Sequence, residues 1–147
     1  MIGLAGRLRA ARFFIMHAYS GTLRYSPKIL GNRVSAKWWL VVDCEPSLGS
    51  YYRDLYSLHH YRCKSLSKPA WKDHITVIRN EEPLHRDLWE KYDGENLEFS
   101  YLQEPHTNGC YWWLQISCPR LLDIREELGL PRNPSIPFHL SFGHTKS

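Results

Sequence analysis

Two short segments of the chain carry the same chemical groups at the same spacing. Residues 74–76 are His-Ile-Thr and residues 139–141 are His-Leu-Ser. Side chains alternate between the two faces of a β-strand, so the histidine and the hydroxyl of each segment would share one face. Two such strands lying side by side would bring two imidazoles and two hydroxyls together. We therefore predict that four residues are catalytic: His74, Thr76, His139 and Ser141.

This set of groups suits the cleavage of a phosphodiester without a metal. One histidine can remove a proton while the other donates one, and the hydroxyls can hold the non-bridging oxygens. An unperturbed pKa near 6.5 allows one imidazole to be neutral and the other charged near neutral pH. The pattern leaves open which histidine is the base. The alternative is two half-buried strands whose polar faces carry these residues without a catalytic role.

Aromatic and basic residues near the motifs are candidates for substrate binding. Trp71 and Lys72 precede the first motif, where they could stack on a base and contact a phosphate. The alternatives are a core anchor for Trp71 and a solvated charge for Lys72. Tyr111 and Trp113 alternate with Trp112, so one set should face the cleft or solvent and the other the core. We predict that Tyr111 and Trp113 contact the substrate.

The hydrophobic pattern predicts the elements that position these residues. Strands are expected over 38–44, 74–78, 97–101, 111–118 and 139–143, and helices over 50–59, 84–92 and 119–128. Each histidine strand follows a strand–helix unit that begins with Trp-Trp. This order predicts an α+β fold with two pseudo-symmetric lobes, at about 35–92 and 95–147. Their two small sheets would meet at a central cleft, with the helices packed outside.

Composition narrows the range of functions. A chain of 147 residues is long enough for one domain with a substantial core. Aromatic residues make up 14% of it, enough either to fill a core or to offer surfaces to nucleobases, and the net charge of +4 favours an anionic ligand. The four cysteines form no C-x-x-C pair, which favours a reducing compartment without disulfides. No spacing of ligands supports a metal site, and we expect no cofactor.

The first 42 residues contain seven Lys and Arg residues and no Asp or Glu. We interpret residues 1–34 as a basic extension that could follow a phosphate backbone, or as an added strand of the first lobe, before a single domain over 35–147. A mitochondrial targeting peptide is a further alternative. The apolar stretches are too short to span a membrane. A cytoplasmic protein is therefore expected, in the host cytoplasm if the chain is viral.

The two motifs and the order of elements resemble the 2H phosphoesterase superfamily, which has two His-x-Thr/Ser motifs on central strands of a pseudo-symmetric two-lobed fold. The resemblance covers roughly residues 35–144, and the basic first 34 residues have no counterpart. Members act on 2′,3′-cyclic phosphates, ADP-ribose cyclic phosphates, 2′,5′-linked oligoadenylates or cyclic oligonucleotides. Some phage members destroy the cyclic nucleotide signals of bacterial anti-phage defence. The resemblance implies that His74 and His139 are the acid/base pair and that Thr76 and Ser141 hold the phosphate.

The expected function is a metal-independent phosphodiesterase. Its substrate would be a cyclic nucleotide, a cyclic oligonucleotide or an RNA end with a 2′,3′-cyclic phosphate. One alternative is a catalytically idle module on the same scaffold that binds nucleotides or RNA. Another is a sponge that sequesters a cyclic nucleotide in the cleft.

Overall fold

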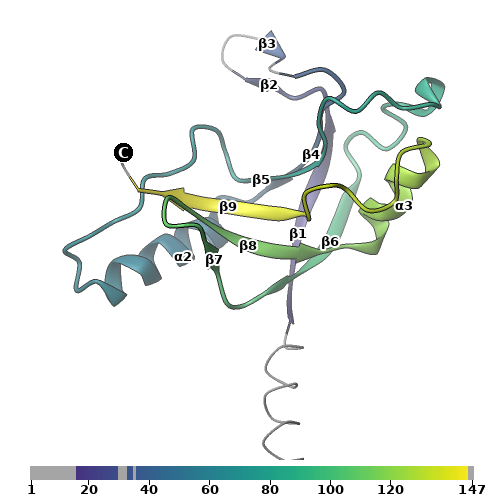
Figure 1. Cartoon of the computed structure of the whole chain (residues 1–147). Helices are drawn as coiled ribbons and strands as arrows, with labels where there is room; N and C mark the ends of the chain where they lie inside the picture. Colours follow the sequence, from purple (N-terminus) through teal and green to yellow (C-terminus); the bar gives the residue numbers. More distant parts are fainter. Residues whose placement is uncertain (1–15, 30–32, 35, 146–147) are drawn as a thin grey trace, which may run out of the picture.

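The computed structural model describes residues 16–29, 33–34 and 36–145. They form an α+β fold around one antiparallel sheet, whose strands follow the order β6-β1-β4-β5-β9-β8 (Figure 1). β6 also pairs with β8, which closes this sheet into a barrel-like ring, and short β7 pairs with β8. The strands of the sheet are β1 (Met16–Tyr25), β4 (Leu40–Cys44), β5 (His74–Ile78), β6 (Asn96–Leu102), β7 (His106–Thr107), β8 (Tyr111–Ser117) and β9 (His139–His144).

The remaining elements lie outside this sheet. Among the residues that the structure describes, the α-helices are α2 (Pro46–His59) and α3 (Pro119–Glu127), at the lower left and the right of Figure 1. A separate small hairpin is formed by β2 (Lys28–Ile29) and β3 (Arg33–Val34). Within the described residues, no helix combines the length and the apolar character that crossing a membrane would need.

The hydrophobic core joins one face of the sheet to both helices. Alternate residues of β4, β5, β8 and β9 enter it, together with apolar residues of α2 and α3. Ile75 on β5 and Leu140 on β9 are both 0% exposed. Burial of such residues is the main favourable term in folding, at about 25 cal/mol per Å² of apolar surface. The residues on either side of Ile75 and Leu140 must therefore point to the opposite face.

Helix α2 begins earlier than the sequence pattern predicts. We expected a helix over 50–59, but it starts at Pro46, directly after Glu45 at its N-cap. Proline suits the first helical position because its fixed φ is helical and its missing N–H would have no partner there. Pro46 therefore begins the helix, two residues after β4 ends at Cys44. The helix expected over 119–128 is present as α3, and it too begins with a proline.

The helix predicted over 84–92 is wrong. Only one turn of 3-10 helix forms there, η1 (Arg86–Leu88). Trp89 is extended, and its ring packs edge-on against Tyr25 at 4.9 Å and Trp38 at 5.2 Å. An isolated helix as short as residues 84–92 is marginal in water. In the structure Trp89 instead packs against Tyr25 and Trp38 from an extended backbone.

The expected pair of small sheets is replaced by a single sheet. β5 from the first motif pairs directly with β9 from the second, which joins the two halves of the chain. β1, from the basic N-terminal region, lies between β4 and β6 and joins the halves a second time. Residues 16–25 of the predicted basic N-terminal region therefore form a strand of the sheet. The start of the chain, for which we considered a targeting peptide, includes residues 1–15, which lie outside the described residues.

One arginine from each helix ties the motif strands in place. Arg53 of α2 donates from Nη1 to the carbonyl of Phe142 at 2.8 Å, and the same nitrogen lies 3.9 Å from the Asp73 carboxylate. These contacts hold α2 against β9 and the start of β5. Asp73 is next to His74 in sequence, and Phe142 is next to Ser141. Arg53 therefore holds the two motif strands from the side on which α2 packs.

Arg125 of α3 makes the second tie and is 0% exposed. It donates to the carbonyls of Val77 and Pro131, both at 3.0 Å, and forms a two-bond pair with Glu81 at 2.7 and 2.9 Å. A buried charge is tolerated only when it is paired and hydrogen-bonded, as Arg125 is. The side chain thereby joins the end of β5 to the loop that leads into β9.

Candidate active site

The two motifs lie on neighbouring antiparallel strands. Ile75 of β5 pairs with Leu140 of β9. Antiparallel pairing then places His74 opposite Ser141 and Thr76 opposite His139. Residues directly opposite each other on one face have Cβ atoms about 4.5–5.5 Å apart, and diagonal neighbours lie about 7–8 Å apart. The two histidines thus occupy one diagonal of a small quadrilateral, and the two hydroxyls occupy the other.

All four side chains share the face that points away from the core. Each is half-buried, while the residues between them, Ile75 and Leu140, are inaccessible. The alternation predicted from the sequence therefore holds on both strands. The structure brings together the four residues that we predicted to be catalytic.

Both imidazoles are oriented by a hydrogen bond to the chain two residues before them. Nδ1 of His74 donates to the carbonyl of Lys72 at 2.8 Å, and Nδ1 of His139 donates to the carbonyl of Pro137 at 2.9 Å. A carbonyl can only accept, so Nδ1 carries the proton in each ring. Nε2 of a neutral ring then keeps its lone pair for proton transfer.

Two tryptophans enclose His74. The ring of Trp71 lies 4.6 Å from the imidazole, and the ring of Trp39 meets it edge-on at 6.0 Å. Trp39 is 2% exposed and packs against both Trp71 and His74. Trp71, which we predicted to bind substrate, is half-buried against the Trp39 ring and the His74 imidazole, so its indole has roles in packing and in shaping the site.

Charged side chains surround the first motif. Asp43 of β4 lies directly opposite His74. Its Oδ2 is 3.2 Å from Nζ of Lys72 and 3.4 Å from Nε of Arg24. The sequence-predicted Lys72 is therefore ion-paired at the rim of the site while remaining largely exposed, at 59% of its side chain. Arg79 places its guanidinium over the Trp39 ring, 5.3 Å from the centroid.

These surroundings lower the pKa of His74 below its ordinary value of 6.5. Burial is the main cause, because it removes water from the charged imidazolium. His139 and Arg79 lower the pKa further by charge repulsion, while the Lys72 carbonyl and the Asp43 carboxylate oppose the shift. His74 is accordingly neutral near pH 7.

A groove of about 470 Å³ opens beside the second motif. Its walls include His139 and Ser141, together with the predicted binding residues Tyr111 and Trp113. The Trp113 ring lies 6.4 Å from His139, and its other neighbour is a stacked ring, His106, at 6.2 Å. The two predicted binding residues thus face the same side of the sheet as the motifs. His74 and Thr76 lie on the adjoining strand rather than in the walls of this groove.

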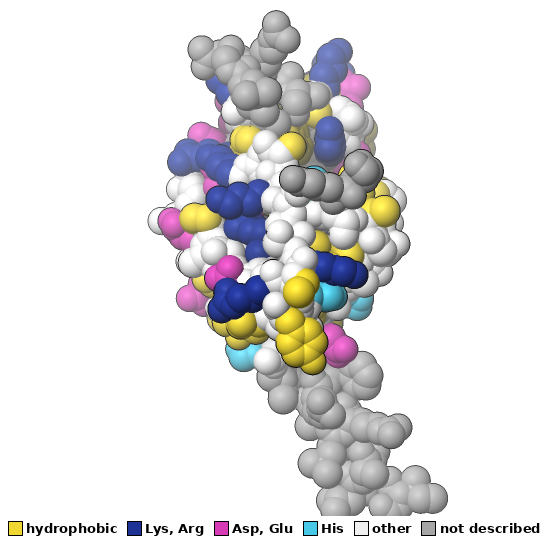
Figure 2. Space-filling view, turned by 90° about the vertical axis from the view of Figure 1, so that its left-hand side faces the viewer, with side chains coloured by type: hydrophobic (Ala, Val, Ile, Leu, Met, Phe, Trp, Pro, Cys, Tyr) yellow, Lys and Arg dark blue, Asp and Glu magenta, His cyan; other side chains and the backbone are white. Residues whose placement is uncertain are grey.

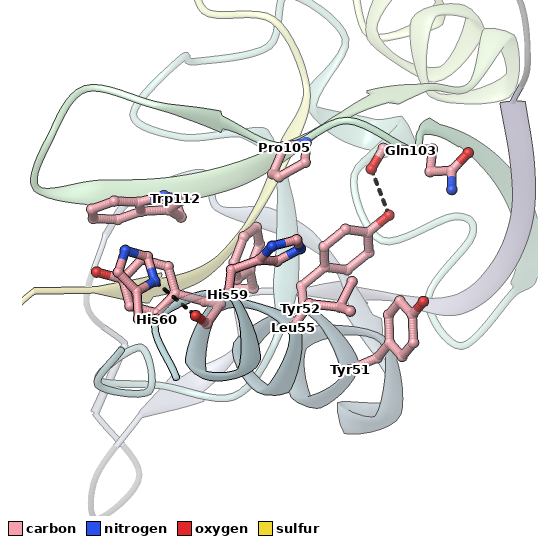
Figure 3. Close-up of a pocket in the computed structure, with 10 residues that line it drawn as sticks. Tyr51, Tyr52, Leu55, His59, His60, Gln103, Pro105 and Trp112 are labelled. Atoms are coloured by element: carbon pink, nitrogen blue, oxygen red, sulfur yellow. Dashed lines mark hydrogen bonds between the residues drawn. The ribbon is translucent and has the colours of Figure 1, made fainter. Parts of the chain in front are cut away.

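A second hollow of about 390 Å³ lies on the other side of β8 and β9, against α2 (Figure 3). Trp112 and Pro105 cover it from one side, and α2 side chains including Tyr52 and His59 line the other. Trp112 alternates with Trp113, so the two indoles lie on opposite faces of β8. The sheet separates this hollow from the predicted catalytic residues.

Sequence reasoning missed three residues that shape the site: Trp39, Asp43 and Gln115. Trp39 directly precedes β4, Asp43 lies on β4, and Gln115 of β8 lies opposite His139. All three lie within strands that we predicted. Identifying them required knowing that β4 flanks β5 and that β8 flanks β9, which no local pattern specifies.

Basic residues recur near the first motif. The loop between α2 and β5 contains Arg62, Lys64, Lys68 and Lys72, all exposed. Lys and Arg side chains are numerous over the face of the molecule in Figure 2. Positive side chains of this kind attract anionic ligands. In the described part of the chain, no cluster of three or more His, Cys, Asp or Glu side chains is arranged to hold a metal ion.

No protein-family model, no curated protein and no solved structure matches the chain. The case for a function therefore rests on the chemistry of the site itself.

Proposed function

We propose that the protein is a metal-independent phosphodiesterase in which His74 and His139 act as an acid/base pair on a nucleotide substrate. The observation that carries this proposal is the direct pairing of the two motif strands, with both histidines and both hydroxyls on one face. The hydrogen bonds at Nδ1 support it further, because they leave Nε2 of each ring free for proton transfer.

The diagonal arrangement suits displacement at phosphorus. Attacking and leaving oxygens lie on opposite sides of the phosphorus, so their proton acceptor and donor must also lie on opposite sides. The His74–His139 diagonal, about 7–8 Å long at the backbone, provides such a pair. The hydroxyls of Thr76 and Ser141 occupy the other diagonal, where they can donate hydrogen bonds to the non-bridging oxygens as charge develops.

The reaction then needs only side chains of this chain. One histidine takes a proton from the nucleophile, which is water or a 2′-hydroxyl next to the phosphate. The new P–O bond forms as the bond to the leaving oxygen breaks, and the other histidine protonates that oxygen. Each proton transfer typically contributes about 10²- to 10⁴-fold to the rate.

The surroundings of the site favour a nucleotide as substrate. Indole rings lie beside each histidine, Trp71 on one side and Trp113 on the other, and stacking on an aromatic ring is a common way to bind a base. The substrates we propose are a cyclic nucleotide, a cyclic oligonucleotide or an RNA end with a 2′,3′-cyclic phosphate.

Two parallels between the motif strands support the resemblance to the 2H phosphoesterase superfamily. Each motif strand has a flanking strand, β4 beside β5 and β8 beside β9, and each histidine is bonded to the carbonyl two residues before it. We propose that the two halves are related in this way around the site, within the single sheet.

A substrate panel tests the proposal. Purified protein is incubated with cyclic dinucleotides, cyclic trinucleotides and 2′,3′-cyclic monophosphates in EDTA, and the products are identified by mass spectrometry. We expect turnover of at least one class that is lost in His74→Ala and His139→Ala. His59→Ala, on α2 and away from the motifs, is the matched control and should retain turnover.

The same panel addresses the idle binding module, which the exposed basic residues of the loop before β5 favour. A module of that kind would bind a panel member in a salt-sensitive way and release it intact. Recovery of intact ligand from every mixture, despite measurable binding, would replace the enzyme with that second function.

A further inference from the structure

We propose that the two histidines have different and fixed roles: His74 is the general base, His139 is the general acid, and the leaving group occupies the groove beside β8. This assignment rests on the phosphodiesterase function proposed above and gives the reaction a direction across the site. The two motifs match in sequence, so the difference between the rings comes from what surrounds them.

The enclosure of His74 disfavours its charged form. The Trp71 ring at 4.6 Å and the nearly inaccessible Trp39 ring at 6.0 Å take the place of water around the imidazole. An imidazolium loses hydration in such a setting, whereas a neutral ring loses little. With Nδ1–H donated to the Lys72 carbonyl, the neutral ring holds its free lone pair at Nε2, as a base requires.

The charged groups near His74 come from four strands and the loop before β5. Asp43 on β4 is the acid that would favour protonation, but its Oδ2 is already paired with Lys72 from the loop and with Arg24 from β1. Arg79 at the end of β5 and His139 on β9 both repel a proton on His74. The balance of these contacts and of burial lowers the pKa of His74. The Asp43 carboxylate therefore does not give His74 the role of general acid.

His139 has different neighbours. The residue opposite it on β8 is the uncharged Gln115, and among the described residues the only aromatic ring that packs beside it is Trp113, at 6.4 Å. The groove of about 470 Å³ opens directly next to it. Of the two rings, His139 is therefore the one whose surroundings leave room for a leaving group. As the general acid it would donate the proton from Nε2, because Nδ1 is bonded to the Pro137 carbonyl.

The position of the acid fixes the position of the leaving group. A general acid must lie within hydrogen-bond reach of the oxygen that it protonates. His139 lines the groove together with Trp113 and Tyr111, so the leaving nucleoside would lie there, against aromatic surfaces. In the step itself, His74 removes the proton of the nucleophile and the P–O bond to the nucleophile forms. The P–O bond to the leaving group breaks, and His139 supplies the proton for that oxygen.

A change of leaving group separates the two roles. Two ribonucleoside 3′-phosphodiesters are compared, one releasing a nucleoside 5′-alkoxide and the other releasing 4-nitrophenolate. The alkoxide needs a proton as it leaves, whereas the phenolate leaves without one. Both substrates need the base. Single-turnover rates are measured for the wild type, His74→Ala and His139→Ala, with His74→Gln and His139→Gln as second variants and circular dichroism as a check of folding.

We expect His139→Ala to lose about 10²- to 10⁴-fold on the alkoxide substrate and less than about 10-fold on the nitrophenyl substrate. His74→Ala should lose about 10²- to 10⁴-fold on both. The reverse pattern, or equal losses for both variants on both substrates, would overturn the assignment and leave the enzyme proposal standing. No turnover of any phosphodiester by the wild type, here and in the panel, would overturn the proposed function itself.

Discussion

Removal of the motif hydroxyls is the perturbation that separates catalysis from folding most cleanly. Thr76→Val keeps the shape and β-branching of the side chain, and Ser141→Ala removes one oxygen. Both residues are half-buried, and within the part of the chain that the structure describes neither hydroxyl is held by a hydrogen bond. Their removal therefore leaves no protein group without a partner, and we expect changes in unfolding free energy within about 0.5 kcal/mol.

The effect on the reaction should be much larger. In the proposed transition state each hydroxyl donates to a non-bridging oxygen that carries negative charge, and such hydrogen bonds are worth about 1.5–3 kcal/mol. At about 1.36 kcal/mol per factor of ten, each variant should lose about 10- to 150-fold in kcat. The hydroxyls lie on opposite corners of the site and would contact different oxygens in the proposed transition state, so the double variant should lose roughly the product of the two factors.

The assay is steady-state cleavage of the panel substrate, alongside urea unfolding of each variant. Ser117→Ala is the matched control. Ser117 is an exposed serine at the end of β8, and its replacement should leave both kcat and stability unchanged. Wild-type kcat in either motif variant would refute the role assigned to that hydroxyl. A loss of activity that matched a loss of folded protein would refute the separation between catalysis and folding.

Three further outcomes follow from the geometry. Because the pKa of His74 lies below 6.5, the acidic limb of kcat/KM should have its midpoint below pH 6.5, and a midpoint above pH 6.5 would contradict the base assignment. The same depressed pKa should lower the free energy of unfolding as pH falls below 6.5, because the unfolded chain then binds the proton more readily than the folded one. Arg125→Met should lower the unfolding free energy by about 3–5 kcal/mol in urea, because Glu81 and two carbonyls lose their partner, and a loss below about 1 kcal/mol would show that this tie does not hold the strands. If the Trp113 indole stacks on a base, Trp113→Ala should weaken substrate binding by about 1–3 kcal/mol at nearly constant kcat. Isothermal titration with a non-cleavable analogue measures the binding, and steady-state kinetics measure kcat. Unchanged binding would exclude that contact.

The ion pair of Arg125 also predicts a dependence of stability on pH. Arg125 lowers the pKa of the Glu81 carboxyl below its ordinary value of 4.5. A depressed carboxyl pKa stabilises the fold fully above the unfolded value, and this contribution is lost as pH falls from about 4.5 through the lower folded-state value. Wild-type unfolding free energy should therefore fall in that range, and Glu81→Gln should show a smaller fall.

The sequence predicted the placement of the motif residues better than the scaffold around them. The period of two in each motif predicted the shared face of the four groups, since that alternation is a local property of a strand. It also predicted Tyr111 and Trp113 on one face of β8. The neighbours of a strand are a property of the whole chain, so Asp43 and Gln115 were missed although the strands that carry them were predicted.

Errors in the scaffold have the same origin. The pattern of Leu84, Leu88, Trp89 and Tyr92 has helical spacing, but Trp89 is held by Tyr25 and Trp38, which lie more than 50 residues away in sequence. Likewise, nothing local indicates that β1 lies between β4 and β6 and joins the two expected sheets into one. Tertiary contacts overrode local preference in both cases.

The most direct test of the account compares the two single histidine variants with the double variant on one cleaved substrate. If His74 and His139 act together on one phosphate, each single alanine variant should lose about 10²- to 10⁴-fold in kcat. The double variant should then be little worse than the poorer single variant, because groups that act as a unit are not additive. Full activity in either single variant, or a double variant slower by the product of two independent losses, would contradict the claim that both imidazoles act on the same phosphodiester.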